Sequence, residues 1–175
     1  MIVMLCLFVL GADVESGPEK GTVIAKLEAY AVTGDPKEKT VDLAAACKDK
    51  LTLYLIVGEE KFDRPMNRFF KAIDEKLGSD FEGVQGVTVF LTQEEKKLKE
   101  LLPRVQMAVN YGQLTLNIFQ GKDGPKDWNI NSDAHLTVLI VDKGKVVARY
   151  GYKSVNETEA PAVLRELSNH YKKKK

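Results

Sequence analysis

Cys47 is the residue whose type and neighbours most directly suggest chemistry in this chain. A thiolate is a strong nucleophile, and it supports peroxide reduction or disulfide exchange. Lys48 and Lys50 follow closely along the chain, and their positive charges would lower the pKa of the thiol. The opposing interpretation is a small, half-buried residue in a strand or turn. We favour that interpretation, because no second cysteine lies nearby in sequence to resolve a disulfide.

A run of charged residues at positions 59–64 offers a second kind of chemistry. Asp63 precedes Arg64 and Pro65, and proline is favoured in the first turn of a helix. A carboxylate at that point is stabilised by the helix dipole. We therefore expect Asp63 to cap a helix rather than to act as a catalytic acid or base.

The two histidines, His135 and His170, lie far apart in sequence, whereas a metal site needs several convergent ligands. The chain also lacks the motifs of a phosphate-binding glycine loop and of a nucleophile elbow. We therefore expect no metal and no cofactor. His135 is the histidine to test, because it directly precedes an apolar run that we expect to be a strand.

The overall charge argues against a nucleic-acid partner. Lys and Arg number 26 against 25 Asp and Glu, which gives a net charge of +1. Nucleic-acid binding depends on neutralising many phosphates with basic side chains. Part of the positive charge lies in four lysines at positions 172–175, which we expect to form a solvated basic tail.

The first twelve residues predict export. Residues 2–10 are uninterruptedly apolar, too short to span a bilayer as a helix but long enough for the apolar part of a signal peptide. A basic segment before them is missing, so the alternatives are a start site placed too late or a buried strand. We expect residues 1–12 to be a truncated signal peptide, and the mature protein to be periplasmic or extracellular without a stable membrane span. Removal of Cys6 with this segment would leave no disulfide partner for Cys47.

The elements that must position these residues can be followed along the chain. Residues 13–21 predict a linker, and residues 22–49 predict an N-terminal β extension with strands at 22–32 and 39–46. Residues 51–57 are the near-continuous apolar run of a strand covered on both faces. The helix that begins at Pro65 has one apolar face, made of Met66, Phe69, Phe70, Ile73 and Leu77.

From residue 87 onward, the sequence predicts alternating strands and helices. Strands are predicted at residues 87–91 and 114–119, and a hairpin at 137–141 and 145–150. The intervening segments predict a helix capped by Thr92 and Glu95, a single helical turn at 126–130, and a last helix capped by Asn156 and Glu159. This order predicts an α/β fold with three α/β/α layers and a mixed central sheet.

Residues 50–171 resemble the thioredoxin superfamily, and within it the redoxin branch that includes peroxiredoxins. The resemblance rests on residues 127–130, on the strand and Asp-Lys-Gly-Lys hairpin of residues 136–147, and on Gly151 after the last strand. It implies a thioredoxin-like domain, with residues 22–49 as a β-hairpin extension. It also implies an active site at the start of the first long helix.

Two departures from the family pattern fall at that site. With Pro65 on the motif's proline, Asp63 and Met66 stand where the family has its two cysteines. Leu136 stands where the family has a cis-proline, and a cis bond before a residue other than proline costs about 2.5–4 kcal/mol. The resemblance therefore implies the fold while the residues argue against its usual thiol chemistry.

These observations predict a redox-inactive, exported thioredoxin-like module that binds a protein or peptide. The expected binding groove is formed by Phe62, Asp63, Arg64, Pro65, His135 and Leu136. The alternative is a thiol peroxidase or disulfide exchanger that uses Cys47 alone. That alternative requires Cys47 to be partly exposed, to lie near Pro65 and Leu136, and to have a lowered pKa.

Overall fold

The computed structural model describes residues 13–171. The predictions for residues 1–12, including the signal peptide and Cys6, and for the tail at 172–175 lie outside the described residues and stay predictions. The described elements are β1 (Glu28–Ala31), β2 (Lys39–Asp42), α1 (Leu43–Ala46), β3 (Leu51–Gly58), η1 (Glu59–Lys61), α2 (Arg64–Asp80), β4 (Gln85–Thr92), α3 (Glu95–Val109), β5 (Leu114–Gln120), η2 (Lys126–Trp128), β6 (Leu136–Asp142), β7 (Lys145–Tyr152), η3 (Glu157–Glu159) and α4 (Ala160–Tyr171).

The strands form one mixed sheet in the order β2-β1-β5-β4-β3-β6-β7. Strand β3 lies inside it, parallel to β4 and antiparallel to β6. Seven of its eight residues are buried, which explains the near-continuous apolar run that predicted it. The predicted hairpin at the N-terminal side is confirmed, and it joins the main sheet because β1 pairs with β5.

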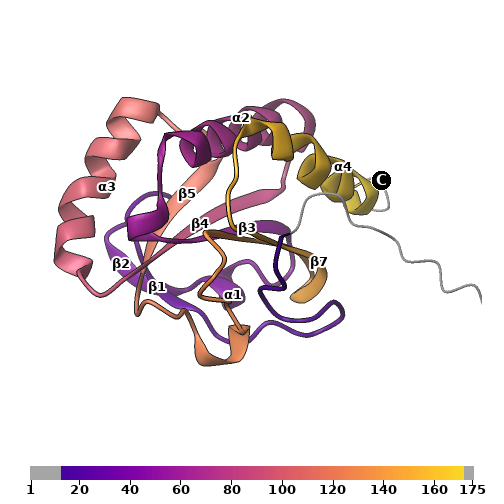
Figure 1. The fold of residues 1–175 in the computed structure, drawn as a ribbon, viewed down its shortest axis with the longest axis horizontal. Helices are drawn as coiled ribbons and strands as arrows, with labels where there is room; N and C mark the ends of the chain where they lie inside the picture. Colours follow the sequence, from indigo (N-terminus) through magenta and orange to yellow (C-terminus); the bar gives the residue numbers. More distant parts are fainter. Residues whose placement is uncertain (1–12, 172–175) are drawn as a thin grey trace, which may run out of the picture.

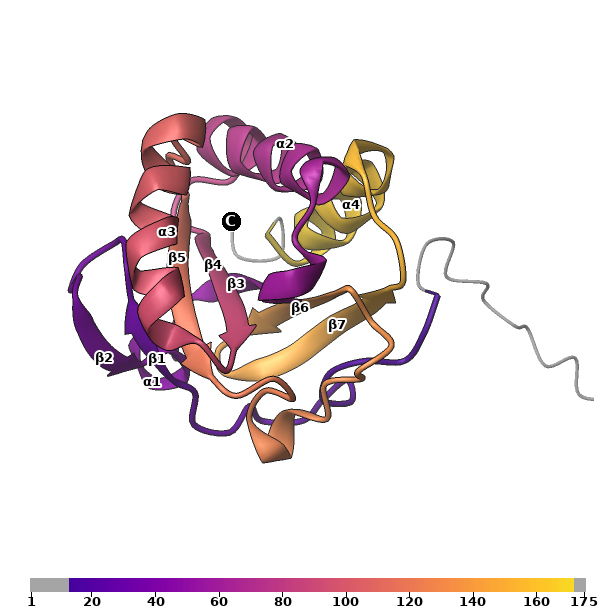
Figure 2. The same ribbon diagram turned by 60° about the vertical axis from the view of Figure 1, so that its left-hand side comes forward.

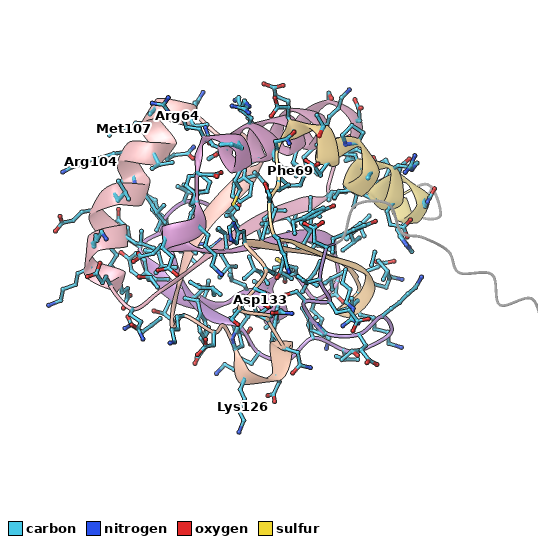
Figure 3. All side chains as sticks on the ribbon, in the orientation of Figure 1. Arg64, Phe69, Arg104, Met107, Lys126 and Asp133 are labelled. Carbon is cyan, nitrogen blue, oxygen red and sulfur yellow. The ribbon has the colours of Figure 1, made fainter. Side chains whose placement is uncertain are left out.

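The two faces of the sheet are covered differently (Figures 1 and 2). Helices α2, α3 and α4 lie on one face. There Phe69 points from α2 into the core (Figure 3). The other face is covered by the N-terminal segment, α1 and the single turn η2, whose Trp128 is fully buried. We expected helices on both faces. The second layer instead consists mostly of extended chain and short turns.

Buried polar contacts close the edge of the sheet at which β3, β4 and β5 begin. The carboxylate of Asp74, 4% exposed on α2, accepts hydrogen bonds from the backbone N–H groups of Gly112, Gln113 and Leu114 at 2.7–2.9 Å. These are the residues that lead into β5. The carboxylate is buried and is compensated by three donors, of which the Leu114 N–H is itself buried. These bonds fix α2 against the start of β5.

Residues 13–18, which we call the strap, lie along the outer strand β7. The backbone N–H groups of Asp13 and Val14 donate to the carbonyl of Gly151, and Arg149 donates to the carbonyl of Gly17. A Cβ on Gly151 would come within 2.3 Å of the Val14 carbonyl oxygen, so only glycine allows this approach. These residues belong to the segment that we predicted as a linker, residues 13–21, and they are held against β7 by these contacts.

Two further local predictions were wrong, and both concern capping. Residues 43–46 form α1 rather than strand, because the Asp42 side chain accepts hydrogen bonds from the N–H groups of Ala44 and Ala45. The Thr92–Glu95 capping box is also absent: α3 is preceded by Glu94, which makes no side-chain capping bond. The capping box of Asn156 and Glu159 is confirmed, and it precedes η3 and α4.

Candidate functional site

The start of α2 has the capping geometry that the sequence predicted. The Asp63 carboxylate accepts a hydrogen bond from the Met66 N–H at 2.9 Å, and Pro65 lies in the first turn. Met66 is 1% exposed and belongs to the helix-side core. Asp63 is therefore occupied as a cap, and Met66 faces away from solvent. Neither residue can supply a thiolate at this helix terminus.

The position of the family's cis-proline is also structural here. Leu136 is fully buried and pairs with Val57 at the end of β3. Among the described residues, the cis peptide bond is that between Asp35 and Pro36, so the bond preceding Leu136 is trans, as expected. His135 is exposed, and its backbone N–H donates to the Tyr152 carbonyl. Of these two predicted groove residues, only His135 presents a side chain to solvent.

A cleft of about 510 Å³ lies close to this predicted groove, but its lining differs. It is lined by the last residues of β3 and β4, by the loops that follow β3, β4 and β5, and by the segment that precedes β6. These residues are Ile56, Gly58, Glu59, Glu60, Lys61, Leu91, Thr92, Gln93, Glu94, Lys122, Asp123, Ile130, Asn131, Ser132 and Ala134. None of the six predicted groove residues lines it. Lys61 and Ala134, however, directly precede Phe62 and His135 in the chain.

The cleft and the start of α2 belong to opposite sides of the sheet. Ile56, Leu91 and Ile130, its apolar lining, pack with the core beneath the N-terminal segment. Phe62 packs with the core beneath the helices, and its ring contacts those of Phe70 and Phe90. Successive residues of a strand point to opposite faces. The ends of β3 and β4 therefore contribute side chains both to the cleft and to the helix-covered face.

Thr92 connects two loops of the cleft at the end of β4. Its hydroxyl donates to the Glu59 carboxylate at 2.8 Å and accepts from the Glu94 N–H at 2.7 Å. The side chain is 1% exposed, so both bonds are shielded from bulk water. The residue that we predicted as a helix cap therefore positions a carboxylate in the cleft.

Residues 129–134, which we call the cleft wall, are held from two directions. From η1, the Lys61 ammonium donates to the carbonyls of Ser132 and Ala134, at 2.5 and 3.3 Å. From the strap, the Ser16 hydroxyl accepts from the Asn131 N–H, and the Asn131 side chain donates to the Glu15 carbonyl. A loop held on both sides is well placed to give a cleft a fixed shape.

The charged groups of the cleft are four carboxylates and two ammonium groups. The carboxylates are those of Glu59, Glu60, Glu94 and Asp123, and the ammonium groups those of Lys61 and Lys122. In the described part of the chain, no group of three or more His, Cys, Asp or Glu side chains could hold a metal ion. The arrangement suits hydrogen bonding and ion pairing with a ligand.

Cys47 lies at the other end of β3 and on the face opposite α2. It is 8% exposed and packs in the core beneath the N-terminal segment. Val57, the partner of Leu136, lies six positions after Leu51, and at about 3.3 Å per residue these two positions are roughly 20 Å apart. Burial raises the pKa of the Cys47 thiol, and opposing contacts with Tyr54 and Lys50 do not outweigh it. The location, exposure and pKa that the thiol-enzyme alternative requires are therefore not observed.

Sequence reasoning missed the cleft because four separate loops build it. One signal was visible: polar and charged residues follow directly on the buried strands at 59–61, 92–94 and 120–123. The carboxyl ends of parallel strands meet at one edge of a sheet. That rule would have brought Glu59 and Thr92 together. The contribution of Ser16 carried no such signal, since its partners lie more than a hundred residues away.

Comparison with known proteins identifies the fold. No known family model matches the sequence, and no curated protein resembles it significantly. Solved structures do match. Reduced Prx3 from Vibrio vulnificus superposes with a TM-score of 0.65 at 13% identity, covering 86% of this chain and 99% of that one.

A putative protein disulfide isomerase from Bacteroides thetaiotaomicron gives 0.64 at 15% identity, over 91% and 95% of the two chains. A putative thiol:disulfide interchange protein DsbE from Chlorobium tepidum gives 0.60 at 17% identity, over 85% and 98%.

The chain therefore has a thioredoxin-like α/β fold, and its structural neighbours are redoxins.

Proposed function

We propose that this protein is a thioredoxin-like binding module for a protein or peptide segment, and that its binding site is the cleft at the carboxyl ends of β3, β4 and β5. One observation carries the proposal. The end of β3 opens into a fixed polar cleft, whereas the helix start beside it presents Asp63 and a buried Met66. Ligands of open α/β sheets bind outside the carboxyl ends of the strands.

The dimensions and lining of the cleft support a side-chain-sized ligand group. A volume of about 510 Å³ lies in the usual range for ligand sites. Ile56, Leu91 and Ile130 supply apolar contact, and the loops supply donors and acceptors around it. A segment of a protein partner can fill such a site with one or two side chains, while its backbone continues over the surface.

The charge of the lining favours a basic segment. Of the two ammonium groups, that of Lys61 is already held by two carbonyls, whereas Glu60 and Asp123 are exposed. A lysine or arginine side chain of the partner can therefore pair with a carboxylate here. The exposed side chains of Arg64 and His135 adjoin the cleft in sequence, and we propose that a longer partner extends over them.

A peptide-display selection on the folded protein tests the proposal. We expect selected peptides to carry Lys or Arg, and Glu59→Gln with Glu60→Gln to weaken their binding at least tenfold. The matched control is Glu75→Gln with Glu82→Gln, two exposed carboxylates away from the cleft. Selection of peptides that bind both double variants equally would place the site elsewhere.

A turnover assay tests the redox half of the proposal. Wild type and Cys47→Ser are compared with hydrogen peroxide and with a disulfide substrate. We expect both proteins to be as inactive as buffer, because the Cys47 thiol is buried and its pKa is raised. Turnover by wild type that is lost in Cys47→Ser would contradict the proposal and support the thiol enzyme.

A further inference from the structure

The cleft wall depends on a segment from the far end of the chain. Ser16 is 1% exposed, and its hydroxyl makes two contacts at once. It lies 2.5 Å from the hydroxyl of Thr137, the second residue of β6, and it accepts the Asn131 N–H at 2.9 Å. One buried hydroxyl thus joins the strap, the start of β6 and the cleft wall. Buried polar groups of this kind are costly to leave unpaired.

The backbone of the strap reinforces the same junction. The Gly17 N–H donates to the Asn129 carbonyl, and the Glu15 carbonyl accepts the Asn131 side chain. Gly17 has a φ of 92°, and a Cβ there would come within 2.5 Å of Leu139. The strap therefore fits against β6 with no room for a side chain at this point. Beside the cleft, the strap hydrogen-bonds Asn129, Asn131 and Thr137, yet none of its residues lines the cleft.

We propose that the strap is a positioning element of the binding site, which sets the conformation of the cleft wall through Ser16 and so couples its own docking to ligand binding. The proposal rests on the cleft being the binding site. If the strap is released, the backbone N–H of Asn131 loses its acceptor, the Ser16 hydroxyl, and the Asn131 side chain loses its acceptor, the Glu15 carbonyl. Among the described residues, the hydrogen bonds that still reach the wall from outside are then those of Lys61. By reciprocity, a ligand that binds the ordered wall must favour the docked strap.

Hydrogen exchange of the full chain tests the positioning role without a ligand. In Ser16→Ala, we expect amides of residues 129–134 to exchange at least tenfold faster than in wild type, while amides of β4 are unchanged. Thr137→Val, which removes only the hydroxyl partner, should loosen the wall less. Ser154→Ala, an exposed serine beyond β7, is the matched control. Unchanged exchange at 129–134, or an equal increase throughout the sheet, would overturn the proposal.

A second variant covers the case in which Ser16→Ala fails to fold. Asn131→Ala removes the side-chain bond to the Glu15 carbonyl from the wall side. If strap and wall are coupled, exchange of residues 13–18 should rise in this variant although none of them is mutated. Protection of the strap that stays at the wild-type level would overturn the coupling.

A binding measurement separates this inference from the function it rests on. A peptide selected on wild type should bind Ser16→Ala at least fivefold more weakly, and Ser154→Ala equally well. Equal binding to all three proteins, with a loosened wall, would refute the coupling while the proposed function stands. If wild type selects no peptide, the proposed function fails. The exchange data on the two variants then decide the positioning role alone.

Discussion

The two ends of strand β3 differ. The chain before its first residue, Leu51, contains the buried Cys47, and the chain after its last residue, Gly58, lines the cleft. At the Leu51 end, Cys47 is buried in a core, and the buried carboxylate of Asp74 accepts hydrogen bonds from three backbone N–H groups. We call this the closed end, and the Gly58 end the open end. At the second end, polar groups such as Thr92 and Lys61 connect loops around open space. Stabilising contacts therefore lie at one end of the sheet, and the proposed binding site lies at the other. Substitutions at the two ends should therefore have different consequences.

The largest expected effect is that of Asp74→Ala at the closed end. Three backbone N–H groups lose their acceptor, of which that of Leu114 is buried, and hydrogen bonds to charged groups each contribute about 1.5–3 kcal/mol without adding fully. We expect the free energy of unfolding to fall by about 4 kcal/mol, as measured by urea denaturation. Glu75→Ala, its exposed neighbour, should change it by less than about 0.5 kcal/mol. A loss below about 1.5 kcal/mol for Asp74→Ala would show that the closed end is not the stabilising one.

Thiol labelling gives the next effect. In a Cys6→Ser background, the folded protein should react with an alkylating reagent about a hundredfold more slowly than the denatured chain, because Cys47 reacts only in opened states. Folded and denatured rates within tenfold of each other would mean that the thiol is accessible, and the two ends of β3 would be chemically alike.

The same thiol gives a pH dependence with a defined sign. Its pKa is raised in the folded state, so above the ordinary thiol pKa the unfolded chain binds fewer protons than the folded one. This contribution to stability is complete below the ordinary pKa and is lost as the pH rises toward the raised value. In Cys47→Ala the corresponding decrease should be absent. Equal slopes in both proteins above pH 8.5 would contradict the assignment.

At the open end, Thr92→Val should have a smaller effect on stability. It keeps the side-chain shape but removes the donor to Glu59 and the acceptor of the Glu94 N–H. We expect a loss of about 1–2 kcal/mol in thermal or urea unfolding, together with weaker binding of selected peptides. Thr40→Val on the exposed strand β2 is the control. A loss as large as that of Asp74→Ala would remove the distinction between the two ends.

The smallest effect on stability is expected for Lys61→Met. The ammonium group bonds two carbonyls at the surface, so the free energy of unfolding should change by less than about 1 kcal/mol. Exchange of the amides at 132–135 should nevertheless rise several-fold, because the wall loses one of its two attachments. A large global loss without a local change would show that Lys61 stabilises the fold rather than the cleft.

Much of the fold could be predicted because it follows local periodicity. The apolar run of β3 and the helical face containing Phe69 and Ile73 are patterns within one segment. Asp63 and Asn156 were recognisable as caps for the same reason, since a cap acts on N–H groups two or three residues away. Each of these features depends on neighbours in sequence, so no knowledge of tertiary contacts was needed.

For the candidate site, the sequence predicted only the correct edge of the sheet, the one at which β3 and β4 end. The groove was placed beside α2 because the resemblance put the active site at that helix. The cleft instead lies on the other side, since Ile56 and Leu91 point away from α2. Thr92 matched a capping box, but its hydroxyl bonds Glu59, a partner 33 residues away. The position of the cleft and the role of Thr92 therefore depend on contacts between residues that are distant in sequence, which local patterns do not contain.

The order in which the chain is synthesised determines when the strap can dock. Its bonds reach across the chain: Arg149 donates to Gly17 over 132 positions, and the Lys153 N–H donates to Asp13 over 140. A ribosome adds about 5–20 residues per second, so the strap is made roughly 7–28 s before its docking surface. A chain released early, before β7 is complete, would leave the strap undocked and the edge of β6 unpaired, open to other strands. The outer edge of the sheet is therefore closed only after β7 has been made, by residues that lie more than a hundred positions earlier in the chain.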